Sequence, residues 1–361
     1  MIEYENLYEL NKRFATDYKN KVDQVLGSGQ FILGKQVKEF ENNFAAYCGS
    51  KFCIGVANGM DALTLALKSF SFESRAEVLV PSNTYIASIL AILNANLTPV
   101  LVEPDIRTYT MDPWLLEQAI SKNTVAIMPV HLYGKCCDMD RIGKVAVKYS
   151  LKIIEDCAQA HGAKFRNRKA GSFGDFGAFS FYPTKNLGAL GDAGCLTTDD
   201  EGLNRIVNLL RNYGSGVKYY NQIQGMNSRL DELQAAFLSV KLEALDSINS
   251  HKRKLAAIYS AELKEDFIKP VHHDDYHDVF HIYNIRHSKR DKLRDYLLKS
   301  GIVTEIHYPV APHQQEALLK LVGNKAYPIS EEIHSTTLSL PISLIHSQDD
   351  AQKVVEVMNK F

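Results

Sequence analysis

The stretch from Gly174 to Gly194 reads GDFGAFSFYPTKNLGALGDAG. Its apolar first half predicts a buried strand, and a Pro-Thr-Lys turn then delivers a single lysine, Lys185. Glycines on both sides would let the backbone approach a bulky group closely. A lysine amine held in a partly apolar site can lose its proton and form a Schiff base with a carbonyl. A loop lysine in solvent explains this stretch equally well, so the choice depends on the rest of the chain.

On the N-terminal side of this stretch, short apolar runs alternate with segments of helical periodicity. Continuous apolar runs are typical of parallel strands that are covered on both faces, and the alternation predicts an α/β fold with a mostly parallel sheet. The runs that we interpret as strands are 53–56, 77–80, 99–102, 125–130, 152–154, 176–181 and 193–197.

From Ser228 onward the pattern changes. Ser228-x-x-Asp231 predicts a capping box, and apolar residues at helical spacing then continue to about residue 264. Beyond it, strand-like segments at 280–286, 303–308 and 338–342 alternate with helical ones, which predicts a small α+β unit. We therefore expect a large domain with N-terminal helices over residues 1–245 and a small C-terminal domain over residues 246–361.

Composition argues against several classes of function. The chain has 361 residues, with 41 Lys and Arg against 42 Asp and Glu, and this near balance gives no sign of nucleic-acid or membrane-surface binding. Six scattered cysteines without a C-x-x-C pair indicate reduced thiols in a cytoplasmic protein. The N-terminus lacks an apolar signal core, and the longest apolar run, 86–93, is too short to span a bilayer.

The predicted strand ends offer the parts of one ligand site, because ligands of open α/β sheets bind beyond the carboxyl ends of the strands. The amides of Gly59 and Met60 open a helix and could hold a phosphate, with the Ser180 hydroxyl as a further donor. Tyr85 could stack on a flat ring, although a core tyrosine is the commoner interpretation of such a residue.

Asp156 closes a buried strand, where a carboxylate needs a cationic or hydrogen-bonding partner. A protonated pyridine nitrogen would be such a partner, and Gln159 could reach a neighbouring ring oxygen; a structural cap is the alternative role for Asp156. A phosphate cradle, a ring stacker, a buried carboxylate and a Schiff-base lysine are together the needs of pyridoxal 5'-phosphate.

Two other chemistries compete with this interpretation. Four histidines, His272, His273, His277 and His281, lie close in sequence, but without an H-E-x-x-H pattern a solvated loop is favoured over a metal site, and we expect none. A Schiff-base aldolase without a cofactor would need neither the phosphate cradle nor Asp156.

The chain also resembles a known family over essentially its whole length. It is similar to the DegT/DnrJ/EryC1/StrS sugar aminotransferases in these segments: ANGMDAL (57–63), PSNTYIAS (81–88), PVHLYG (129–134), EDCAQAHGA (155–163), GAFSFYPTKNLGALGDAG (177–194), RNYGS (211–215) and NSRLDELQAA (227–236). The resemblance implies a fold type I, aspartate aminotransferase-like enzyme that works as a homodimer with active sites at the subunit interface.

Roles follow from the resemblance, position by position. It implies that Lys185 carries the cofactor and shuttles the proton, that Asp156 pairs with the pyridine nitrogen, and that Gln159 lies at the ring hydroxyl. It also implies cofactor contacts from five further residues, with the last supplied by the partner subunit: Gly59, Met60, Tyr85, Ser180 and Asn227. Met60 departs from the family, in which Thr or Ser is frequent, so one hydroxyl contact to the phosphate is lost. A related dehydratase branch has His in place of Lys185, so the lysine favours amino transfer.

The segments EPDIRTYTMDP (103–113), PVHLYGKCCDMD (129–140) and EIHYPVAPHQQEA (305–317) look most like transaminases of nucleotide-linked 3-keto-6-deoxyhexoses. This likeness implies amino transfer from L-glutamate, which leaves as 2-oxoglutarate, to a dTDP-3-keto-6-deoxyhexose. The product, a dTDP-3-amino-3,6-dideoxyhexose, would enter lipopolysaccharide O-antigen, S-layer or other glycan biosynthesis. The candidates for hexose contacts are Tyr182, His307, Tyr308 and His161, although 307 and 308 could equally be a structural strand end. Amination at C4 and a catalytically silent regulator that binds the cofactor stay open as alternatives.

Overall fold

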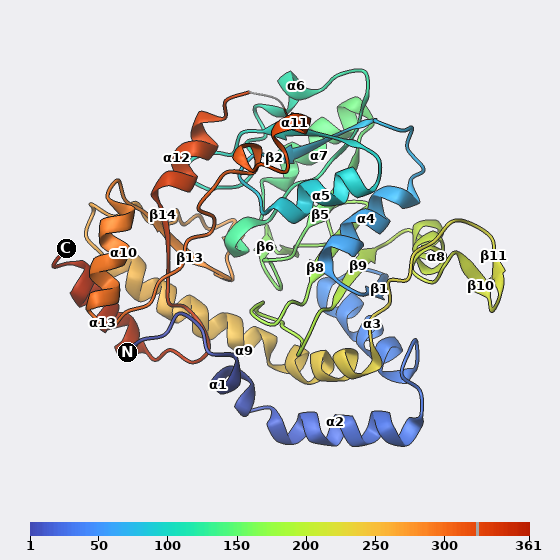
Figure 1. Cartoon of the computed structure of the whole chain (residues 1–361), viewed down its shortest axis with the longest axis horizontal. Helices are drawn as coiled ribbons and strands as arrows, with labels where there is room; N and C mark the ends of the chain where they lie inside the picture. The colour runs from blue at the N-terminus through green and yellow to red at the C-terminus, as the bar shows by residue number, and fades with distance from the viewer. Residues whose placement is uncertain (323–324) are drawn as a thin grey trace.

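A computed structural model describes residues 1–322 and 325–361. Its centre is a seven-stranded sheet in the order β1-β9-β8-β5-β4-β2-β3, in which only β9 runs antiparallel to its neighbours (Figure 1). The predicted α/β fold with a mostly parallel sheet is therefore confirmed. The strands are β1 (Phe52–Val56), β2 (Glu77–Pro81), β3 (Thr98–Val102), β4 (Thr124–Ile127), β5 (Lys152–Asp156), β8 (Phe176–Ser180) and β9 (Gly194–Thr198).

Helices cover both faces of the sheet, so each strand buries side chains on two sides. Val78 and Val80 of β2 pack in one apolar cluster with α4, α5 and α8, whereas Leu79 between them packs in a second cluster with α3, α7 and α9 (Glu232–Glu262). The helices of this part are α1 (Leu7–Lys12), α2 (Ala15–Ser28), α3 (Lys35–Cys48), α4 (Gly59–Ser69), α5 (Ile86–Asn94), α6 (Leu116–Ala119), α7 (Met139–Tyr149) and α8 (Glu201–Leu210). Within the described ranges, no helix has the length and apolar character that a membrane crossing requires.

The long helix α9 (Glu232–Glu262) begins later than the sequence predicts. The predicted capping box at Ser228 is wrong, because the Ser228 hydroxyl accepts a hydrogen bond from the Ala57 amide (3.2 Å) instead of capping the helix. The first α9 residue instead caps another helix: the Glu232 carboxylate accepts hydrogen bonds from three amides at the start of α3, those of Gly34, Gln36 and Val37. This contact fixes α9 against α3 beneath the sheet.

A third apolar cluster lies in the C-terminal part. It joins the second half of α9 to β13 (Tyr283–Arg286), α10 (Arg290–Lys299), β14 (Thr337–Leu340) and α13 (Gln348–Met358). The predicted strand over 303–308 is wrong: apart from the Ile2 pairings described next, this segment makes only one isolated bridge, from Glu305 to Ser339. The capping box predicted at Ser347 is confirmed.

We propose that the domain boundary lies inside α9, near residue 245, where its contacts pass from the sheet helices to this third cluster. One feature differs from the proposed division: Ile2 pairs with the C-terminal part, through the Gly301 carbonyl (2.8 Å) and the Val303 amide (2.9 Å). The remaining short elements are β6 (Lys164–Phe165), β7 (Arg168–Lys169), β10 (Ser215–Val217), β11 (Tyr220–Asn221), β12 (Tyr276–His277), η1 (Leu132–Gly134), η2 (Pro312–Gln314), α11 (Leu319–Val322) and α12 (Pro328–Thr336).

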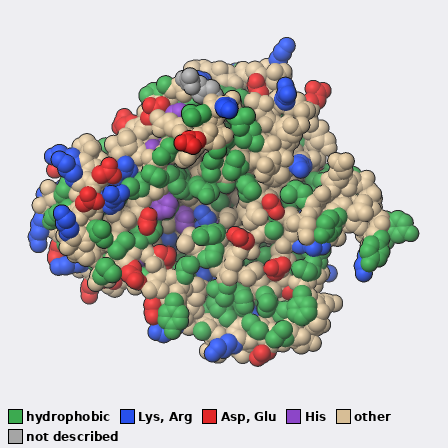
Figure 2. Space-filling view, viewed as in Figure 1, with side chains coloured by type: hydrophobic (Ala, Val, Ile, Leu, Met, Phe, Trp, Pro, Cys, Tyr) green, Lys and Arg blue, Asp and Glu red, His purple; other side chains and the backbone are tan. Residues whose placement is uncertain are grey.

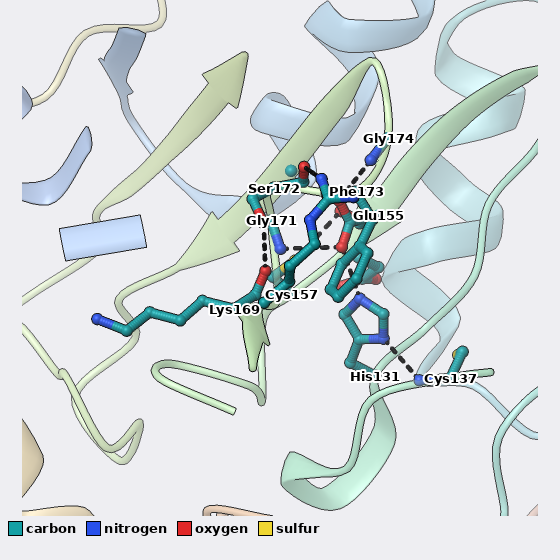
Figure 3. A network of polar contacts seen from close by, with 12 residues as sticks. His131, Cys137, Glu155, Cys157, Lys169, Gly171, Ser172, Phe173 and Gly174 are labelled. Carbon is teal, nitrogen blue, oxygen red and sulfur yellow. Dashed lines mark hydrogen bonds and ion pairs between the residues drawn. The ribbon is translucent and has the colours of Figure 1, made fainter. Parts of the chain in front are cut away.

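A fully buried carboxylate holds the end of β5 (Figure 3). Glu155 accepts hydrogen bonds from the amides of Gly171, Phe173 and Gly174 at 2.7–2.9 Å and from Nε2 of His131 at 2.9 Å. The Cys137 amide donates to the other ring nitrogen of His131 (3.0 Å), so Nε2 is the nitrogen that donates to Glu155. Glu155 therefore ties the turn before β8 to β5, two strands whose ends carry the site described below.

Replacing Glu155 with Gln should lower the free energy of unfolding by about 2–4 kcal/mol, because an amide NH₂ would face backbone donors and the carboxylate charge would be lost. Urea unfolding followed by circular dichroism measures the change. Glu356→Gln on the exposed face of α13 is the matched control and should shift stability by less than about 0.5 kcal/mol. Equal stability of the two variants would contradict this role for Glu155.

Candidate active site

A cavity of about 360 Å³ lies beyond the carboxyl ends of β2, β5 and β8. It brings together ten of the residues that the sequence nominated: Gly59, Met60, Tyr85, Asp156, Gln159, Ser180, Tyr182, Lys185, His307 and Tyr308. Segments from residue 59 to residue 308 thus meet at the position that the strand-end rule predicts. In the space-filling view, histidine side chains lie in a hollow bordered by apolar groups (Figure 2).

The first amides of α4 form an anion cradle. Asn58 caps the helix by accepting from the Asp61 amide (2.8 Å), and among the described hydrogen bonds the amides of Gly59 and Met60 donate none. Ser180 lies directly against Gly59, because a Cβ built on Gly59 would meet the Ser180 Cβ at 2.5 Å. Two unused amides and a hydroxyl at a helix N-terminus are suited to a phosphate group.

Asp156 is a buried carboxylate that faces this cavity. Its oxygens accept hydrogen bonds from the Ser88 hydroxyl (2.7 Å) and the Ala158 amide (3.1 Å). Burial raises the pKa of Asp156, while these hydrogen bonds and the charge of Lys185 oppose the rise. A buried carboxylate of this kind is suited to a cationic partner such as a protonated ring nitrogen.

Lys185 follows β8 in a tight turn in which its amide donates to the Tyr182 carbonyl (2.8 Å). Its side chain lines the cavity that Asp156 also faces. Burial lowers the pKa of the Lys185 amine to about 8, and attraction to Asp156 limits the drop. About a tenth of the amine is therefore unprotonated at pH 7, far more than for an ordinary lysine, and this neutral form is the one that attacks a carbonyl.

Gln159 has both ends of its amide occupied. Its oxygen accepts from the Tyr133 amide (2.7 Å), and its nitrogen donates to the Tyr308 hydroxyl (2.9 Å). The Tyr308 ring in turn lies 5.2 Å from the ring of Tyr85, and the Tyr133 hydroxyl donates to the His307 carbonyl. These contacts fix the C-terminal segment over the cavity and leave Tyr85 half-exposed at its mouth.

Two nominated residues lie outside the cavity lining. His161 is buried with its ring against Phe179 and Phe181, where burial lowers its pKa to about 3, and it is not among the residues that line the cavity; its role at a hexose stays a prediction. The sequence could not predict this position of His161, because the residue follows a strand end, where no helical or strand period applies. Asn227 is exposed and bridges to Asn212 in the same chain.

Sequence reasoning missed Ser88 and His281. Ser88 stands three residues after Tyr85, one helical turn along α5, and this spacing could have suggested that both face one site. His281 was grouped with neighbouring histidines, but it lines the cavity beside Lys185 and has no partner for Nδ1 among the described residues.

The four histidines that lie close in sequence, His272, His273, His277 and His281, do not form a group that could share a metal ion. Among residues 1–322 and 325–361, the His, Cys, Asp and Glu side chains close enough to share a metal ion are His131, Glu155 and Cys157. The Glu155 oxygens already accept four hydrogen bonds there, and the three residues are buried.

The residues fit pyridoxal phosphate. The cradle that a Cβ at Gly59 would fill, the buried carboxylate of Asp156 and the amine of Lys185 border one cavity, and each matches a different part of that cofactor.

Comparisons with known proteins agree with this chemistry. The chain is 51% identical to the "dTDP-3-amino-3,6-dideoxy-alpha-D-galactopyranose transaminase" of Aneurinibacillus thermoaerophilus, over 100% of this chain and 99% of that protein. The structure of Streptomyces venezuelae DesV in complex with a ketimine intermediate matches with a TM-score of 0.97 and 41% identity, covering 99% and 98% of the two chains. Bacillus subtilis NtdA with bound cofactor PMP matches with a TM-score of 0.93 and 29% identity, covering 99% and 84%.

The family model for DegT/DnrJ/EryC1/StrS aminotransferases matches residues 13–359. The chain belongs to the DegT/DnrJ/EryC1/StrS aminotransferase family, and it is a pyridoxal-phosphate-dependent aminotransferase.

Proposed function

We propose that this enzyme moves the amino group of L-glutamate to a dTDP-3-keto-6-deoxyhexose and so forms a dTDP-3-amino-3,6-dideoxyhexose. The observation that carries the proposal is the meeting of Lys185, Asp156 and the Gly59 cradle in one cavity, in a chain 51% identical to a transaminase of that product class. The product would serve O-antigen, S-layer or other glycan synthesis, and we propose a cytoplasmic location for the enzyme.

In this proposal each residue has one task. The Gly59 and Met60 amides and the Ser180 hydroxyl hold the phosphate, Asp156 holds a proton on the ring nitrogen, and Tyr85 covers the ring. When bound, the cofactor supplies an electron sink that stabilises negative charge at the substrate carbon. Lys185 would anchor the cofactor, and its amine would act as the base that takes the α proton of the amino donor and as the acid that gives this proton back.

The keto sugar would enter from the side of Tyr182, His307 and Tyr308. Tyr182 is half-exposed, whereas burial lowers the pKa of His307 to about 4 and leaves a neutral ring that can accept or donate one hydrogen bond. His307 Nδ1 already contacts the Ser339 hydroxyl (2.8 Å), so Nε2 is the ring nitrogen that would be left for a substrate.

We further propose a homodimer in which Asn227 of each chain completes the phosphate site of its partner. The hairpin β10–β11 projects from the molecule and exposes Val217, Tyr219 and Tyr220 by 62–85% of their surfaces (Figures 1 and 2). Phe31 and Ile32 are also about half exposed. Large exposed apolar side chains of this kind favour a surface that a second subunit covers.

The test supplies purified enzyme with L-glutamate and, separately, dTDP-3-keto- and dTDP-4-keto-6-deoxyhexoses, and it identifies products by mass spectrometry and NMR. We expect amination of the 3-keto sugars. Lys185→Ala should abolish turnover and should lose the covalent cofactor label that borohydride fixes at residue 185, whereas exposed Lys353→Ala should match the wild type. Amination only at C4 would refute the substrate assignment, and cofactor binding without amino exchange would favour a regulator.

Gly59→Ala should weaken cofactor binding. The new Cβ would lie 2.5 Å from the Ser180 Cβ, and overpacking of about 1–3 kcal/mol corresponds to a Kd about 5- to 150-fold higher. Gly143→Ala in α7, where a Cβ meets nothing within 4 Å, is the control and should leave the Kd unchanged. Fluorescence titration of the apoprotein gives both values, and equal Kd values would remove Gly59 from the cradle.

Cofactor capture by the apoprotein should depend on pH through Lys185. Because only the neutral amine reacts, the rate should rise about tenfold per pH unit below about 8 and level off above it. Stopped-flow absorbance between pH 6 and 10 measures this rate. A rise that continues to pH 10, as for an ordinary lysine, would contradict the lowered pKa.

A further inference from the structure

The loop that follows Lys185 is held by polar side chains of α9. Lys252 donates from Nζ to the Asn186 Oδ1 (2.9 Å), and Lys241 donates from Nζ to the Gly188 carbonyl (2.9 Å). The two lysines are 11 residues apart, about three turns of an α-helix, and therefore lie on one face of α9. Both are buried, which is rare for a lysine without a carboxylate partner.

Asn186, the residue after Lys185, is saturated by this network. Its Nδ2 donates to the Asn249 Oδ1 (2.8 Å) and the Val279 carbonyl (3.0 Å), and the Asn249 Nδ2 donates to the His161 carbonyl (2.8 Å). Four chain segments are thus joined beside the turn that carries the Lys185 amine. Such a fully bonded buried network restricts the backbone to one conformation.

Lys252 is 5% exposed, and its bonded partners carry no charge. Its Nζ donates to Asn186 and to the His281 carbonyl (3.1 Å), and among the described residues no carboxylate oxygen lies within 4 Å of it. His281 lines the cavity together with Lys185. An unpaired ammonium group therefore lies directly behind the wall of the active site.

Two charged groups, Glu5 and Lys185, act on Lys252 with opposite signs, and neither forms an ion pair with it among the described residues. Burial is the main reason that the pKa of Lys252 is lowered to about 8; the charge of Glu5 raises this pKa, and the charge of Lys185 lowers it by a smaller amount. Burial and the neighbouring lysines also lower the pKa of His161 and His281, so both rings are neutral at pH 7. Because charge coupling is reciprocal, a proton on Lys252 disfavours a proton on Lys185.

We propose that Lys252 is a positioning residue for Lys185: it fixes the turn through Asn186, and its positive charge favours the unprotonated form of the Lys185 nitrogen. The proposal rests on the cofactor-anchoring role proposed above for Lys185. Among the described residues, none of those that line the cavity belongs to α9. Through Lys252, this helix would nevertheless act directly on the Lys185 nitrogen.

The test is a spectrophotometric pH titration of the cofactor band in the holoenzyme, which reports protonation of the nitrogen that Lys185 contributes. In Lys252→Met the midpoint should rise by about one pH unit, because removal of a nearby cation favours the protonated form. Lys252→Gln, which keeps a hydrogen-bond donor but no charge, should rise as well, and Lys252→Arg should stay near the wild-type midpoint. Lys241→Met, which removes an equally buried lysine farther along the loop, is the matched control and should not shift.

The outcomes separate the two proposals. If borohydride fixes no cofactor on Lys185 of the wild type, the anchoring role fails and this proposal fails with it. If the cofactor is fixed there but the midpoints of Lys252→Met and Lys252→Gln move by less than about 0.2 unit, only the role of Lys252 is overturned. A shift in Lys241→Met as large as that in Lys252→Met would also overturn it, since the effect would then be one of general loop packing.

Discussion

The site depends on two adjacent carboxylates at the end of β5. Side chains alternate along a strand, so Glu155 and Asp156 point to opposite faces of the sheet. Glu155 is buried among backbone amides and His131, where it fixes the turn that leads into β8. Asp156 faces the cavity at the same height, with Ser88 and the Ala158 amide as its donors. One carboxylate thus holds the scaffold, and its neighbour is free for a cationic ligand.

Desolvation then tunes the reacting groups in opposite directions. Burial raises the pKa of Asp156 and lowers that of Lys185, and each charge partly offsets the cost of burying the other. The histidines around the cavity are pushed toward their neutral forms by the same burial. Their rings can therefore take part in hydrogen bonds without adding positive charge, and Lys252 is left as the cation behind the wall.

Much of the site was predictable because it follows strand ends. Asp156 ends a strand that its apolar run reveals, Gly59 and Lys185 follow two others, and parallel strands bring their carboxyl ends to one edge. The capping box predicted at Ser228 is wrong because a Ser-x-x-Asp pattern is local. The Ser228 hydroxyl instead accepts a hydrogen bond from an amide far away in the sequence, that of Ala57. Similarly, the position of His161 next to a motif in sequence does not predict that its ring lies outside the cavity lining.

The sequence by itself determined the α/β class, the cofactor and most of the residues that line one cavity, because period, strand-end chemistry and motif order are local properties. Only the tertiary structure decided which side chains support the cavity-lining residues from outside the cavity. Lys241, Asn249 and Lys252 read as ordinary positions of a long helix, yet packing turns that face toward the loop after Lys185. Burial, and with it the pKa of each group, depends on contacts between segments far apart in the chain, which no local pattern records.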